Sequence, residues 1–220
     1  MDWPAVTLSL RLALWTSIVL LPLGLMIARF LAWRDFPLRG FVEALIALPL
    51  VLPPTVLGYY LLISFSPNNA LGGSFQILFG QPLAFTFEGL VVASVIFNLP
   101  FAVQPLQRAF ETVPQSVREA AWCSGLSRWR TFWRVELPLA WPGAVTALVL
   151  TFAHTLGEFG VVLMVGGNIP GETRTIAIAI YDRVQAFDNA AAAAMSVLLL
   201  GLSFLAIGIV FALGRRHVRF

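Results

Sequence analysis

Five long apolar segments constrain this chain more than any other feature of its sequence. They cover residues 8–31, 44–65, 84–106, 139–165 and 190–213. A bilayer crossing needs roughly 20 mostly apolar residues in a helix, because hydrocarbon offers no partners for exposed backbone polar groups. We therefore predict an all-α, polytopic membrane protein with about five transmembrane helices, forming a single transmembrane domain over residues 1–220.

The composition excludes the main alternatives. Of the residues, 59% are hydrophobic and 11% are charged, which is more apolar side chain than one soluble core can bury. Disorder requires low hydrophobicity and a disulfide scaffold requires many cysteines, whereas this sequence has one Cys. All 14 basic residues are arginines scattered between the apolar segments, so the sequence predicts no nucleic-acid partner.

The positions of the arginines predict the orientation in the membrane. Eleven of them lie in the loops after the first and third segments and in the tail after the fifth segment. Cytoplasmic loops carry an excess of arginine, so we expect a cytoplasmic C-terminus and an external N-terminus in a bacterial inner membrane. The first segment lacks a basic leader and a small-residue cleavage pattern, so we expect it to remain as an anchor.

A weaker apolar stretch over residues 174–186 is too short to cross a bilayer. If it were a sixth span, the arginines of the tail would face the outside. We therefore expect a short external or re-entrant helix there.

The loop over residues 107–138 is the one long polar and aromatic segment, and it predicts a hairpin of two short helices. Thr112 and Gln115 have the spacing of a capping box for a first helix that runs to about Ser124. Gly125 suits a left-handed cap, and Ser127 can cap the second helix. That helix is expected to end before Pro138.

The second helix of this hairpin carries an aromatic face made by Trp129, Phe132 and Trp133, with arginines around it. Taken alone, these residues favour a hairpin that rests on the lipid headgroups, with its aromatic rings inserted and its arginines on phosphate.

The order and spacing of seven residues in the same loop indicate a different role. They resemble the EAA motif of ABC importer permeases, with Val135 where isoleucine is commoner: Glu119, Ala120, Ala121, Gly125, Val135, Leu137 and Pro138. In that family the loop forms a coupling helix that docks into a groove on a cytoplasmic ATPase. The resemblance implies a type I ABC importer permease fold and assigns ATPase coupling to these residues.

The resemblance continues along the chain, which is similar to the molybdate permeases of this family. It rests on residues 48–59 (LPLVLPPTVLGY), 156–160 (LGEFG) and 168–175 (NIPGETRT). It implies a homodimer that moves molybdate, two cytoplasmic ATPase subunits, and a periplasmic molybdate-binding protein. Sulfate and thiosulfate permeases share the span 4 sequence more loosely, so sulfate, thiosulfate and tungstate are alternative cargoes.

Several polar residues fall inside or beside the apolar segments. Thr151, Thr155 and Glu158 share one face of the fourth segment, next to His154, and Asn98 lies in the third. Glu158 either holds its helix against a neighbour or belongs to a translocation path or gate, since intramembrane ionisable groups rarely face lipid. Asn98 is either a contact between helices or a donor on the path, and the threonines either line the path or bond their own backbone.

Arg174 lies on the predicted external side, where a cation would attract a dianion, although Glu172 and Asp182 offer ordinary ion pairs.

The sequence gives no sign of catalysis or of a bound cofactor. It has no G-x-x-x-x-G-K-[ST] phosphate loop, so we expect ATP to be used by a partner chain, and its two histidines lack the companions that a metal site needs. A secondary transporter driven by an ion gradient is the alternative class. It is disfavoured because the spans contain neither a chain of carboxylates nor an internal duplication.

Overall fold

The computed structural model describes residues 1–217, with side chains described as far as Ile209. Every regular element in this part is helical: α1 (Trp3–Trp33), α2 (Arg39–Val51), α3 (Pro54–Phe65), α4 (Ala70–Phe79), α5 (Phe87–Glu111), α6 (Gln115–Cys123), α7 (Arg128–Thr131), the π-helix η1 (Phe132–Glu136), α8 (Leu137–Leu156), α9 (Gly160–Gly166), α10 (Ile176–Gln185) and α11 (Asn189–His217). Four helices are long and apolar enough to cross a bilayer, and the bent pair α2–α3 makes a fifth candidate. The prediction of an all-α membrane protein is confirmed.

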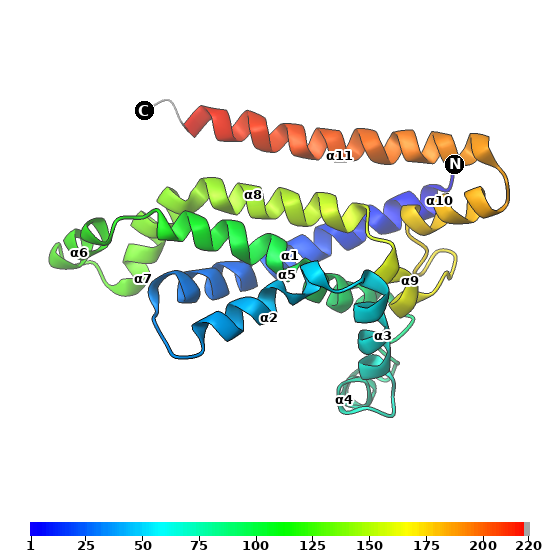
Figure 1. Cartoon of the computed structure of the whole chain (residues 1–220), viewed down its shortest axis with the longest axis horizontal. Helices are drawn as coiled ribbons and strands as arrows, with labels where there is room; N and C mark the ends of the chain where they lie inside the picture. The colour runs from blue at the N-terminus through cyan, green and yellow to red at the C-terminus, as the bar shows by residue number, and fades with distance from the viewer. Residues whose placement is uncertain (218–220) are drawn as a thin grey trace.

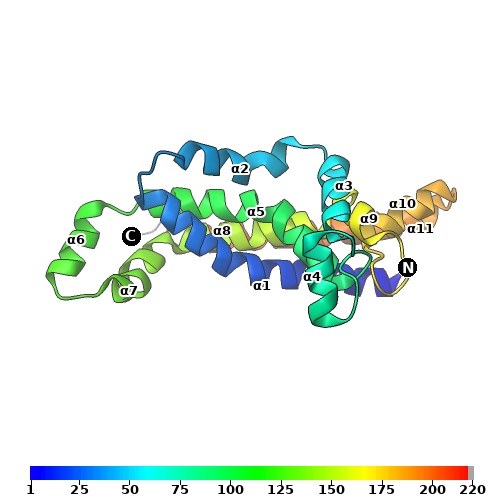
Figure 2. The same ribbon diagram turned by 90° about the horizontal axis from the view of Figure 1, so that it is seen from below.

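Three long helices, α1, α5 and α8, form the centre of the bundle. They lie side by side in Figures 1 and 2 and bury a shared apolar cluster that includes Ala28, Leu106, Phe110, Ala140 and Ala144. Small residues at these contacts let the helix backbones approach closely, which replaces the hydrophobic driving force that lipid removes. The three helices therefore provide the frame to which the remaining elements are attached.

The second predicted span is not one straight helix. Helices α2 and α3 meet at an angle of 110°. The break is at Leu52 and Pro53, whose backbones are extended, with ψ angles of 137° and 133°. A proline disfavours the helical conformation of the residue before it, and Pro53-Pro54 does this twice in succession.

The fourth predicted span also differs from one continuous helix. Helix α8 ends at Leu156, where the prediction placed the boundary at Val165, and a separate short helix, α9, follows from Gly160. Gly157 leaves the helical conformation, with φ −92° and ψ 0°. Glycine destabilises a helix interior, so this position is a natural end for α8.

The predicted helical hairpin protrudes at one end of the bundle, on the left in Figure 1, as α6, α7 and η1. Gly125 has the predicted left-handed conformation, with φ +81°, and the Ser127 hydroxyl accepts the predicted capping bond from the N–H of Arg130. The predicted capping box is wrong. Thr112 ends α5 and its hydroxyl donates to the carbonyl of Ala109, so α6 begins at Gln115 after Pro114.

The predicted end of the second hairpin helix before Pro138 is also wrong. Helices α7, η1 and α8 follow one another without a break, as one helical segment from Arg128 to Leu156. Pro138 lies in the first turn of α8, directly after five residues of π-helix. The wider π-helical turn, in which the N–H of Leu137 bonds to the carbonyl of Phe132, accommodates a proline that lacks its own N–H.

Among the four long candidate spans, helix α11 is the least buried within the described residues. It lies along α8 and runs from the end that holds the N-terminus towards the end that holds the hairpin (Figure 1). The 174–186 stretch forms the short helix α10, which packs against α11 and α1. The N-terminus and the hairpin thus lie at opposite ends of the bundle.

Candidate functional site

The hairpin presents the first half of the motif on its surface. Glu119 and Ala120 on α6 are exposed, whereas Ala121 is buried against the rest of the hairpin. The turn after α6 has the hydrogen bonds of a Schellman motif, from the N–H of Leu126 to the carbonyl of Ala121 and from the N–H of Gly125 to that of Trp122. This motif requires the positive φ angle of Gly125, so the glycine fixes how α6 is turned back onto α7.

The second half of the motif lies at the base of the hairpin. Val135 belongs to the π-helix, and Leu137 and Pro138 begin α8. The seven motif residues therefore form no single cluster. Four of them shape the protruding knob, and three shape the junction through which the knob is joined to a helix of the central bundle.

A buried ion-pair network holds the hairpin against α1. The carboxylate of Glu136 in η1 is fully buried and accepts hydrogen bonds from two arginines. Arg29 of α1 donates through Nε at 2.7 Å and through Nη2 at 3.4 Å, and Arg118 of α6 donates through Nε at 3.2 Å. One carboxylate thus links the first helix of the bundle, the exposed helix of the hairpin and the junction with α8.

Aromatic rings support this network. The guanidinium carbon of Arg118 lies 3.7 Å from the ring centroid of Trp33, and that of Arg29 lies 5.3 Å from the same ring and 5.3 Å from the ring of Phe132. Cation–π contacts of this kind gain strength where the groups are shielded from water. We refer to Arg29, Arg118 and Glu136 together with Trp33 as the Glu136 clamp.

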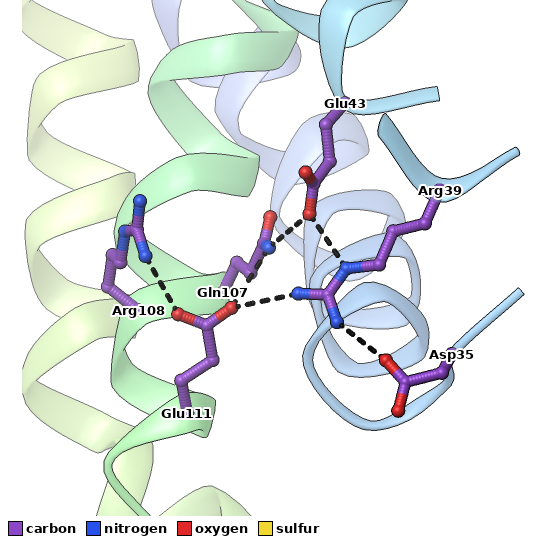
Figure 3. A network of polar contacts seen from close by, with 6 residues as sticks. All are labelled: Asp35, Arg39, Glu43, Gln107, Arg108 and Glu111. Atoms are coloured by element: carbon purple, nitrogen blue, oxygen red, sulfur yellow. Dashed lines mark hydrogen bonds and ion pairs between the residues drawn. The ribbon is translucent and has the colours of Figure 1, made fainter. Parts of the chain in front are cut away.

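A second polar network fastens the start of α2 to the end of α5 (Figure 3). Arg39 is at its centre, within 3.0 Å of Glu43, 3.2 Å of Asp35 and 3.3 Å of Glu111. Gln107 donates to both Glu43 and Glu111, and Arg108 pairs with Glu111 at 3.0 Å. Single exposed ion pairs contribute little, but a network of this size fixes the direction in which α2 leaves the bundle.

Two of the predicted path residues, Asn98 and Glu158, are brought together inside the bundle. Both are buried, and Glu158 Oε2 accepts hydrogen bonds from Asn98 Nδ2 at 3.3 Å and from the hydroxyl of Ser94 at 3.0 Å. Asn98 Oδ1 lies 2.9 Å from His154 Nδ1, and because an amide oxygen only accepts, this imidazole nitrogen is the donor. The four side chains connect α5 to the end of α8 and the break after it.

The side chains of the other predicted path residues make no hydrogen bond with this group within the described part of the chain. Thr155 donates to the carbonyl of Thr151 in its own helix, and the buried hydroxyl of Thr151 has no partner among the described residues. Arg174 lies in the loop before α10, where Nε donates to Asn168 at 2.6 Å and the guanidinium is 3.8 Å from both Asp2 and Asp182. The contacts of Thr155 and Arg174 stabilise a helix and a loop, respectively, whereas the hydroxyl of Thr151 makes no contact that assigns it a role.

The Glu136 clamp is the feature that sequence reasoning missed. Glu136 stands between two motif positions and has no distinguishing spacing of its own. The available signal was an acidic residue beside apolar and aromatic neighbours at the start of a predicted span, where an unpaired carboxylate would be costly. Within the described residues, no group of three His, Cys, Asp or Glu side chains is arranged to hold a metal ion.

Comparisons with known proteins agree with this architecture. The sequence pattern of the family described as binding-protein-dependent transport system inner membrane component matches residues 21–219. The chain is 52% identical over 191 residues to the molybdenum transport system permease protein ModB of Azotobacter vinelandii, which covers 87% of this chain and 84% of that protein. It is 36% identical over 204 residues to the probable sulfate transport system permease protein cysT of Chlorokybus atmophyticus, covering 92% and 71%.

The fold resembles that of a solved transporter. A chain in the crystal structure of a bacterial alginate ABC transporter, in complex with an alginate pentasaccharide-bound periplasmic protein, aligns with a TM-score of 0.77 at 17% identity over 98% of this chain and 79% of that one. The fold is therefore that of an ABC importer permease. The chain belongs to the family of inner membrane components of binding-protein-dependent transport systems.

We predict that Glu136→Gln destabilises the chain by about 3 kcal/mol. The substitution leaves two arginines without their buried counter-ion, and the low end of the usual range applies because the side chain of Arg29 is 34% exposed. The measurement is the thermal unfolding of the detergent-purified chain. Glu119→Gln, which alters an exposed carboxylate of the same hairpin, is the control and should unfold like the wild type.

For Glu158 we expect the structural role, so Glu158→Gln should keep at least half of the wild-type transport rate. The amide oxygen of glutamine can still accept from Ser94 and Asn98, whereas Glu158→Leu leaves both donors without a partner and should greatly reduce the amount of folded protein. Uptake is measured in cells and normalised to the amount of chain in the membrane. If the Glu158→Gln variant reaches normal levels in the membrane but transports nothing, the path needs the charge.

Proposed function

We propose that this chain is the permease subunit of an ABC importer that moves molybdate across the cytoplasmic membrane. A separate ATPase subunit docks on the α6–α7 hairpin and hydrolyses ATP, and this chain itself binds no cofactor. A periplasmic binding protein delivers the oxyanion to the opposite end of the bundle.

The observation that carries the proposal is the protruding hairpin. It displays an exposed carboxylate and a small side chain, Glu119 and Ala120, on a short helix whose direction is set by the Schellman turn at Gly125. The helix is anchored at its base by the Glu136 clamp. A knob of this kind can transmit a force applied by a docked protein to α1 and α8, because it is continuous with α8 and is paired with α1 through the buried carboxylate of Glu136.

Molybdate is favoured over sulfate by the degree of similarity. The relative from Azotobacter vinelandii, whose name specifies molybdenum transport, is 52% identical, against 36% for the sulfate permease relative from Chlorokybus atmophyticus. Tungstate, sulfate and thiosulfate remain the alternative cargoes.

Two copies of the chain, two ATPase subunits and one periplasmic molybdate-binding protein make up the proposed importer. The two-copy assembly is supported by the small size of one bundle, whose central helices pack against one another around a closed apolar core. The solved alginate transporter, which includes a periplasmic protein, supports the binding-protein partner.

Docking of the ATPase should depend on the hairpin surface. We expect Glu119→Arg and Gly125→Pro each to reduce co-purification of the ATP-binding subunit from membranes at least tenfold. The first reverses the exposed charge, and the second places proline, which needs φ near −65°, where φ is +81°. Cys123→Ser, an exposed change on the same helix, is the control. Normal co-purification with both variants would contradict the proposed docking site.

The orientation can be tested with the one cysteine of the chain. Cys123 is free, exposed and located in the hairpin, so it reports which side of the membrane the hairpin faces. We expect a membrane-impermeant maleimide to label it in inside-out vesicles and not in right-side-out cells, in a strain that lacks the ATPase so that the hairpin is uncovered. Labelling from the outside would reverse the proposed topology.

Cells that lack this chain should accumulate at least tenfold less molybdate at low external concentration and should take up sulfate normally. Uptake of both oxyanions is measured in the same culture, with the chain restored from a plasmid as the control. Loss of sulfate uptake together with intact molybdate uptake would reassign the cargo.

A further inference from the structure

A groove between α1 and the hairpin has no role in the proposed function. It has a volume of about 820 Å³, which is in the size range of small-molecule sites, and three residues of the Glu136 clamp, Arg29, Trp33 and Arg118, line it. One wall is the second half of α1, from Pro22 to Arg34, and the other is formed by side chains of α6, α7 and η1.

The α1 wall of this groove is apolar and open. Met26 is 69% exposed and Phe30 is 46% exposed, and Pro22 and Leu25 lie beside them in the groove. These residues belong to a helix that is long and apolar enough to cross a bilayer. This wall therefore continues the exposed apolar surface of α1 into the groove.

Both walls of the groove also carry arginines. Four arginines line it, and two of them, Arg29 and Arg118, are paired with Glu136. The other two, Arg34 and Arg128, are exposed and make no ion pair within the described part of the chain. The groove lining contains no carboxylate. Glu119 is nearby and accepts a hydrogen bond from Gln115 at 2.7 Å, but it does not line the groove. The mouth therefore carries an uncompensated positive charge.

Two exposed indole rings also belong to the lining. Trp129 and Trp133 are 68% and 52% exposed, and Trp129 directly follows Arg128 in the sequence. Tryptophan and arginine together are typical of the headgroup level of a membrane protein, where an amphipathic ring and a cation meet phosphate.

We propose that this groove binds one anionic phospholipid of the surrounding bilayer, with its phosphate at Arg34 and Arg128 and one acyl chain along Met26 and Phe30. The charge and the apolar wall together select an anionic amphiphile, and neither a small anion nor a zwitterionic lipid satisfies both. The hairpin thus has two functional faces. Glu119 and Ala120 face outward to a protein partner, while Trp129, Trp133 and Arg128 face a lipid wedged between the hairpin and α1.

The test is native mass spectrometry of the full-length chain in mild detergent, alone and with its ATPase. We expect dioleoylphosphatidylglycerol to bind at least tenfold more tightly than dioleoylphosphatidylcholine. The double variant Arg34→Ala/Arg128→Ala should lose about tenfold in affinity for the anionic lipid. Because neither arginine has an ion-pair partner among the described residues, this variant should keep the wild-type unfolding temperature. Arg130→Ala, an exposed arginine of α7 outside the groove lining, is the matched control and should bind normally.

Four outcomes would overturn the proposal. Equal affinity for the two lipids, or an equal loss with Arg130→Ala, would show that the groove does not select an anion. Competition by millimolar glycerol 3-phosphate or inorganic phosphate would identify a small-anion site. Displacement of the lipid when the ATPase or a second copy of the chain binds would show that a protein covers the groove.

Discussion

The attachment of the hairpin depends on one buried carboxylate. Glu136 has no contact with water, so its charge is tolerated only because Arg29 and Arg118 reach it from α1 and α6. If either arginine moved away, a charge would be left partly unpaired in a shielded site, so the three elements are held in one arrangement. In the proposed function, this rigidity decides whether a force applied to the hairpin tilts the bundle or only bends the hairpin.

Much of the architecture follows from local features of the sequence. The apolar segments locate the membrane helices because a bilayer leaves the backbone no other option. Gly125 and Ser127 were identifiable because a left-handed turn and a helix N-cap each accept few residue types. The motif that identifies the family is read from spacing alone, and the hairpin that carries it forms where that spacing places it.

The remaining features depend on long-range contacts or on competition between local signals. Thr112 and Gln115 match a capping box, but Thr112 is the C-cap of α5 and α6 begins only at Gln115. A proline such as Pro138 usually marks the end of a helix, yet here the π-helix η1 continues directly into α8. The partners of Glu136 on α1 and of Glu158 on α5 are distant in sequence, so no local pattern could identify them, whereas Asp182, which pairs with Arg174, is close to it in sequence. In the sequence, the 110° bend between α2 and α3 is marked only by a pair of prolines, which indicate a break in the helix but not its angle.

The π-helix decides where this segment tolerates a change in length. The turn at η1 closes with a hydrogen bond from the N–H of Leu137 to the carbonyl of Phe132, so it holds one residue more than an α-helical turn. Loss of one residue there converts it to an ordinary α-helical turn and leaves the direction of the hairpin largely unchanged. Loss of one residue from the first turns of α8 has no such outlet, because an α-helix turns by about 100° per residue. Glu119 would then point in a new direction, and Glu136 would lose its alignment with Arg29.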